Sequence, residues 1–100
     1  EQTTMMIPKE FQTGRRRYSV VLAARLPYND WGRIFYDHGV IKIATHAGRV
    51  KRTPYDMAET FWHEATHAIL HDMRHPAHGD EVFVTEFSRR LTRLVYTAKL

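Results

Sequence analysis

The residues best suited to catalysis lie close together in the second half of the chain, as His63, Glu64 and His67. They form the pattern H-E-x-x-H, and a separation of four residues puts both imidazoles on one face of a helix, one turn apart. Their nitrogens can therefore converge on one ion, and zinc accepts imidazole readily. Glu64 is offset from His63 by about 100° around the helix. Its carboxylate can then act as general base toward a zinc-bound water, whose pKa the metal lowers toward ~7.

His71, one turn further on, cannot complete a site with both of these histidines. It lies about 12 Å along the helix axis from His63, which is too far for one ion to join all three on a straight helix. The class with the pattern H-E-x-x-H-x-x-G-x-x-H is excluded as well, because Met73 stands at the position of its third histidine. Two roles are open for His71: a hydrogen-bond donor that supports the ligands or an oxyanion, or a surface residue near the helix C-terminus.

The third ligand is therefore expected to be an acid on the following helix. Asp80 is the predicted N-cap of that helix, so its carboxylate is already engaged. Glu81 lies in the first turn at the edge of the apolar stripe, whereas Glu86 lies on the other side of that stripe and could be a solvated acid. Geometry modestly favours Glu81 and leaves Glu86 open.

Two helices are predicted to position these residues. Thr53 can cap the first helix and Pro54 suits its first position, and the helix should run to about Met73, before Pro76. A second helix should begin at Asp80, with an apolar stripe at helical spacing. The members of the stripe are Phe83, Val84, Phe87, Leu91, Leu94, Val95 and Ala98.

The first half of the chain favours strands. Residues 18–26 alternate as a strand would, and residues 31–36 and 40–45 flank a short Gly-containing connection that is typical of a β-hairpin. The aromatic residues, including Trp31 and Trp62, are predicted to lie in the core. The predicted fold is α+β: a small antiparallel sheet, made of the strand and the hairpin, packed on the two C-terminal helices.

Length and composition predict one domain over residues 1–100. The absence of cysteine excludes disulfide scaffolds, thiolate zinc sites and cysteine nucleophiles, so any zinc must be held by nitrogen and oxygen. No apolar run approaches the ~18 residues of a membrane span, and no signal peptide is recognisable. These features predict a cytoplasmic protein of a bacterium or of a phage-infected host cell, with no membrane partner.

The formal net charge of +4 has two interpretations. The run Arg15–Arg17 and the basic, Gly-bearing loop predicted at residues 46–52 could attract nucleic acid. However, no RNA-binding signature, helix-turn-helix pattern or zinc-finger spacing accompanies them. A solvated basic surface is favoured, so nucleic acid is not expected as a partner.

The stretch from His63 to His71, H-E-A-T-H-A-I-L-H, resembles the zinc helix of the ImmA/IrrE-like metallopeptidases, which are gluzincin-like enzymes. The metal-binding glutamate of that family lies on the next helix in a pattern like E-x-x-A-x-x-F. Glu81, Val84 and Phe87 match this pattern, with the small residue enlarged to valine. The chain also resembles short phage-encoded proteins of this type, which open with an Ile-Pro-Lys segment, although it lacks a helix that precedes the sheet in longer members.

The resemblance implies that His63, His67 and Glu81 bind zinc and that Glu64 is the catalytic carboxylate. With the spacing above, it leads to the hypothesis of a minimal zinc metallopeptidase, a hydrolase that cleaves a protein or peptide substrate through a metal-activated water. A substrate strand could lie along the exposed edge of the hairpin. The alternative is a zinc-stabilised binding protein, such as a phage factor that occupies a host protein without cleaving it.

Overall fold

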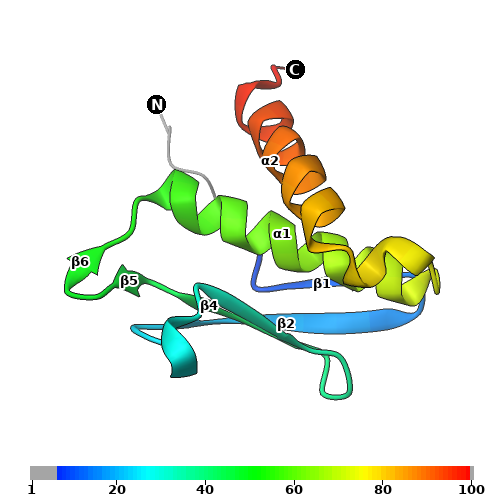
Figure 1. The fold of residues 1–100 in the computed structure, drawn as a ribbon, viewed down its shortest axis with the longest axis horizontal. Helices are drawn as coiled ribbons and strands as arrows, with labels where there is room; N and C mark the ends of the chain where they lie inside the picture. Colours follow the sequence, from blue (N-terminus) through cyan, green and yellow to red (C-terminus); the bar gives the residue numbers. More distant parts are fainter. Residues whose placement is uncertain (1–6, 100) are drawn as a thin grey trace.

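The computed structural model describes residues 7–99 and has the α+β architecture that the sequence predicts (Figure 1). Four strands form one sheet, two short strands form a separate hairpin, and two long helices complete the chain. With η denoting short helical turns, the elements are β1 (Glu10–Thr13), β2 (Arg16–Ala23), η1 (Pro27–Asn29), β3 (Gly32–Phe35), β4 (Val40–Ala44), β5 (His46–Ala47), β6 (Val50–Lys51), α1 (Pro54–Asp72), η2 (Pro76–Gly79) and α2 (Glu81–Thr97).

The four-stranded sheet is mixed rather than antiparallel, which corrects one detail of the prediction. The hairpin of β3 and β4 is antiparallel as expected, but β4 lies between β3 and β2 and runs parallel to β2. The chain leaves β2, skips one strand position, forms β3 at the edge and returns as β4 into the gap. Because β4 is central, the alternation of Ile41, Lys42 and Ile43 decides which face of the sheet is buried.

One face of the sheet carries the hydrophobic core. Ile41 and Ile43 of β4 and Tyr18 of β2 are buried against α1, which contributes Phe61 and Ala65. Ala65 and Ala68 are small, so α1 can approach the strands closely at this contact. Figure 1 shows α1 and α2 on the same side of the sheet, and neither covers the opposite face.

Helix α1 begins at the residue that the sequence predicts. The hydroxyl of Thr53 accepts a hydrogen bond from the backbone N–H of Asp56, and Pro54 occupies the first position. Arg52, directly before the cap, is buried and donates to the carbonyl of Ala44 and to the carboxylate of Asp56. Arg52 thereby ties the first turn of α1 to the end of β4, which sets the position of the H-E-x-x-H turns along the sheet.

Helix α2 contacts α1 largely through small side chains, and Val84 is the one member of its apolar stripe that is buried there. Figure 1 shows it crossing α1 and extending away from the sheet. Its buried residues are Val84, Ser88 and Thr92. Most of the apolar stripe is not buried, since Phe87 and Leu94 are exposed. At 100° per residue, the centre of the stripe lies about 80° around the helix from the face that meets α1.

Two further expectations about the first half of the chain need correction. Trp31 is 58% exposed and so is not a core residue, whereas Trp62 is partly buried against the core. Residues 46–52 are not an irregular loop, because β5 and β6 pair there as a short antiparallel hairpin. Within residues 7–99, neither helix is long and apolar enough to cross a membrane.

Candidate metal centre

Three side chains from two helices meet at one point: His63 and His67 of α1 and Glu81 of α2. Nε2 of His63 lies 3.1 Å from one carboxylate oxygen of Glu81, and Nε2 of His67 lies 3.0 Å from the other. One ligand atom from each residue lies within 4.8 Å of the others. Ligands about 2.0–2.1 Å from a tetrahedral zinc ion are about 3.3 Å apart, so both the spacing and the donor types suit a metal. The group could hold a metal ion.

A backbone carbonyl orients His67 for this role. Its Nδ1 lies 2.7 Å from the carbonyl oxygen of His78 in η2. A carbonyl oxygen only accepts, so Nδ1–H is the donor, and Nε2 is the ring nitrogen that faces Glu81. Two acceptor atoms 3.0 Å apart need a proton or a metal cation between them. The hydrogen bond from Nδ1 to a carbonyl is also the common support of a metal-binding histidine.

His63 is held in the neutral form, which is the form that binds metals. Burial, and after it the neighbouring His67, lowers the pKa of His63 from its usual 6.5, against the opposing effect of Glu81. Imidazole must be neutral to coordinate a metal. His63 is therefore available as a ligand at neutral pH.

Of the three acids considered for the third position, Glu81 is the one beside both histidines. Asp80 caps α2, as predicted, by accepting a hydrogen bond from the backbone N–H of Phe83. Glu86 is exposed and forms an ion pair with Arg90 at 2.6 Å. The turn η2 returns the chain from the end of α1 and places the first residue of α2 over the histidines.

Glu64 lies beside this group in a buried position. Burial, with the nearby carboxylates of Glu81 and Asp30, raises the pKa of Glu64 from 4.5 to about 7. Gly32 of β3 permits this approach, because a Cβ there would clash with the Thr60 side chain and come within 3.2 Å of a carboxylate oxygen of Glu64. A carboxyl group with a pKa near neutrality can both take and give a proton at neutral pH.

Two open cavities flank the group along β3, which is an edge strand of the sheet. One has a volume of about 510 Å³ and reaches from His67 and Glu81 to Tyr36. The other has a volume of about 400 Å³ and extends toward Trp31 and Arg89. His63, Glu64 and Gly32 line both cavities, so the metal group and the buried carboxyl lie where the two meet. An extended ligand could therefore pass over them.

Sequence reasoning did not single out Tyr36, which the structure places at the larger cavity. Burial, and then the charges of Glu64, Tyr18 and Glu81, raises the pKa of Tyr36 above its usual 10, so the hydroxyl keeps its proton at neutral pH. The alternation of side chains along a strand indicates Tyr36, because it shares one face of the hairpin arm with Gly32 and Ile34.

His71 contacts Tyr36 rather than the ligands. The two rings are stacked with their centroids 3.9 Å apart, and the ring of His78 meets His71 edge-on. His71 is exposed and lies outside the group of three ligands. Its contact with a residue of the cavity is compatible with a supporting role, which stays a prediction.

The site thus combines two imidazoles, one carboxylate, a buried carboxyl with a pKa near 7 and two adjoining cavities. Comparison with known proteins adds no assignment, because no family model, curated protein or solved structure matches the chain.

Proposed function

We propose that this protein is a zinc-dependent peptidase. The observation that carries the proposal is the buried carboxyl of Glu64 beside the group of His63, His67 and Glu81. A structural zinc site is closed by four protein ligands and does not require a buried acid next to it. Three protein ligands with an adjacent base are the composition of a catalytic site, in which the fourth position is left for water.

Each residue of the site has one task in this proposal. His63, His67 and Glu81 hold zinc, which when bound acts as a Lewis acid and lowers the pKa of water to about 7. Glu64 takes a proton from the attacking water and returns it to the amine that leaves. Tyr36 donates a hydrogen bond to the peptide oxygen on which negative charge develops. His71, stacked on Tyr36, positions that ring.

The substrate class follows from the edge strand. An extended peptide can pair with the free edge of β3 through main-chain hydrogen bonds, while its side chains alternate into the neighbouring spaces. Such a peptide would run past Gly32 and over the junction of the two cavities. Main-chain pairing recognises any extended peptide, so sequence preference would come from the cavities, which Tyr36 and Arg89 line.

The test compares the zinc-loaded wild type with Glu64→Gln on a peptide library, with mass spectrometry of the products. The substitution keeps the size of the side chain but removes the proton acceptor, so we expect cleavage to fall by about 100-fold or more while zinc content stays at one ion per chain. Glu86→Gln is the matched control, because it makes the same change at an exposed site. Cleavage that is equal in wild type and Glu64→Gln contradicts the proposal.

The alternative, a zinc-stabilised protein that binds a partner without cleaving it, gives a different result. It also requires zinc at His63, His67 and Glu81, but no product appears and Glu64→Gln leaves the biological effect of the protein intact. Both the peptidase and the binding protein require zinc. A pure sample that cannot bind zinc would therefore overturn both hypotheses.

A further inference from the structure

The charges of this protein are divided between its two halves. Residues 7–52, which form both sheets, contain ten Lys and Arg against three Asp and Glu. Residues 53–99, which form the helices, contain five Lys and Arg against seven Asp and Glu. The modest net charge of the whole chain therefore conceals a strongly basic half and a mildly acidic half. A positive field over a single region favours an anionic partner for that region.

The open face of the four-stranded sheet collects part of this positive charge. Side chains alternate along a strand, so residues next to the buried Ile41 and Ile43 point to the face that no described helix covers. Lys42 is one of them, and the strand register puts Arg33 of β3 directly beside it. Both side chains are exposed. Arg17 of β2 is exposed as well and alternates with the buried Tyr18, so it lies on the same face.

Aromatic rings lie among these cations. The ring centroid of Phe35 is 5.8 Å from the guanidinium carbon of Arg33 and 5.5 Å from Nζ of Lys42. The ring of Tyr28, in η1, is 5.9 Å from the same guanidinium carbon and is 87% exposed. Tyr28 also has a positive φ of 61°, an unfavourable conformation for a tyrosine. Tyr28 and Phe35 therefore present aromatic rings beside the two cations of this face.

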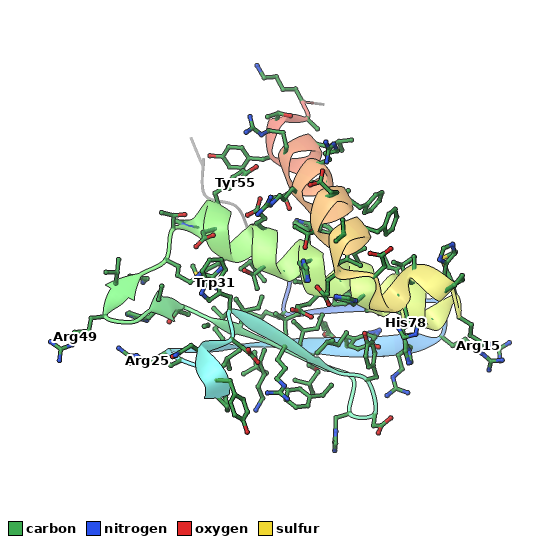
Figure 2. The ribbon with its side chains drawn as sticks, in the orientation of Figure 1. Arg15, Arg25, Trp31, Arg49, Tyr55 and His78 are labelled. Carbon is green, nitrogen blue, oxygen red and sulfur yellow. The ribbon has the colours of Figure 1, made fainter. Side chains whose placement is uncertain are left out.

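The acids near this face do not neutralise it. Asp30 approaches Arg33 at 3.4 Å and Glu10 approaches Arg17 at 3.6 Å, but all four side chains are substantially exposed. Exposed pairs of this kind contribute little and exchange readily for another anion. Figure 2 shows further arginines at the ends of the molecule, with Arg25 and Arg49 at one end and Arg15 at the other.

From this arrangement we propose that the open face of the four-stranded sheet, defined here by Tyr28, Arg33, Phe35 and Lys42, binds single-stranded nucleic acid. Phosphates would lie against Arg33 and Lys42, and unpaired bases would stack on Tyr28 and Phe35. A sheet that offers cations and aromatic rings suits splayed bases, whereas reading a duplex needs an element inserted into its groove. Arg17 adds to this basic surface, whereas Arg16 lies on the side of β2 that carries the buried Tyr18 and donates to the backbone carbonyl of Tyr36. Arg33 also borders the larger cavity at the metal centre, but Tyr28, Phe35 and Lys42 line neither of the two cavities, and the proposal does not depend on the proposed peptidase activity.

The experiment measures fluorescence anisotropy of a labelled short oligodeoxythymidine and of its RNA counterpart over a range of salt concentrations. We expect binding to weaken with salt, with a slope of log K against log salt of about −0.7 for each phosphate neutralised. The double variant Arg33→Gln/Lys42→Gln should reduce that slope by about 1.4 and weaken binding by about tenfold or more. Tyr28→Ala should weaken binding by at least about fivefold with no change of slope.

The matched control is Arg90→Gln/Arg93→Gln, which removes the same charge from exposed positions of α2. Retained affinity in this control supports a site on the open face, while an equal loss in both double variants reduces the effect to net charge and overturns the proposal. Absence of oligonucleotide binding at low salt also overturns it. So does tighter binding to a duplex of the same length, or to anionic phospholipid vesicles, than to the single strand. Because these substitutions are at exposed side chains, circular dichroism should show an unchanged fold for each variant.

Discussion

The two helices that supply the metal group are anchored very differently. Helix α1 lies on the sheet and buries Ala58, Phe61, Ala65 and Ala68. Helix α2 buries only Val84, Ser88 and Thr92, of which two are small hydroxyl residues. Its large apolar residues stay largely exposed, and Figure 1 shows its far end projecting beyond the rest of the fold.

The same contrast holds for the ligands themselves. The side chain of His67 is 8% exposed and is held by the carbonyl of His78, whereas the side chain of Glu81 is 68% exposed. Burial and the carbonyl of His78 therefore orient His67, while the position of the Glu81 carboxylate depends on how α2 docks. A metal bound by all three residues would join the two helices and stabilise the weaker contact. The predictions that follow test this difference.

Zinc should have the largest effect on stability. For the wild type, free zinc at a thousand times Kd should raise the free energy of unfolding by about 4 kcal/mol. His67→Ala should bind zinc at least about 100-fold more weakly, because loss of a ligand exceeds the effect of losing its support. Thermal unfolding with zinc and with a chelator measures both, and His38→Ala, in the exposed hairpin turn, is the control. A zinc effect that survives in His67→Ala would place the metal elsewhere.

The buried acid of α1 should make the metal-free protein less stable at high pH. Burial raises the folded-state pKa of Glu64 from 4.5 to about 7, so the folded form keeps a proton that the unfolded chain loses. Stability is therefore fully present below about pH 4.5 and is lost as the pH rises through about 7. Glu64→Gln remains neutral, so we expect it to be more stable than wild type by roughly 3 kcal/mol near pH 8 and similar near pH 4.

Glu86, the exposed acid of α2, should affect stability with the opposite dependence on pH. The hydrogen bond and charge of Arg90 lower the pKa of Glu86, so the stability that this carboxylate contributes is present at neutral pH and is lost as the pH falls. Denaturant unfolding of Glu86→Gln near pH 8 should therefore show no gain in stability. An equal gain in both variants, or a gain in Glu64→Gln that does not change with pH, would contradict the difference between the helices.

The smallest effect should come from changing how α2 docks without touching a ligand. Ser88→Leu introduces a larger side chain between the helices, which should lower the free energy of unfolding by about 1–3 kcal/mol. It should also weaken zinc binding, because Glu81 moves with α2 while the histidines stay in place. Isothermal titration calorimetry compares it with Arg93→Leu, which places the same side chain at an exposed position of α2. Unchanged zinc affinity in Ser88→Leu would show that Glu81 is positioned independently of this contact.

Features set by short-range patterns could be predicted from the sequence. The cap at Thr53, the cap at Asp80 and the hairpin arms each depend on residues within a few positions of one another. The pairing of His63 with His67 follows from helix geometry in the same way. Glu81 could be placed on the correct helix, but geometry alone could not choose it over Glu86, because that choice depends on the path of the chain through η2.

Features that join distant segments could not be predicted. The parallel pairing of β2 with β4, the contact of Gly32 with Glu64, and the carbonyl of His78 beneath His67 all connect residues that no local pattern relates. Which face of α2 is buried also depends on distant segments, because small residues on the face beside the apolar stripe allow the closer approach of two helices.

The sequence by itself determined the ligand types, their spacing on α1 and the α+β class, because helical periodicity and capping are properties of adjacent residues. Only the tertiary structure decided that Glu81 faces both histidines, that Glu64 is buried enough to raise its pKa, and that Arg33 and Lys42 share an open sheet face. Desolvation and convergence of charge depend on the chain's packing in three dimensions, to which residues far apart in sequence contribute jointly.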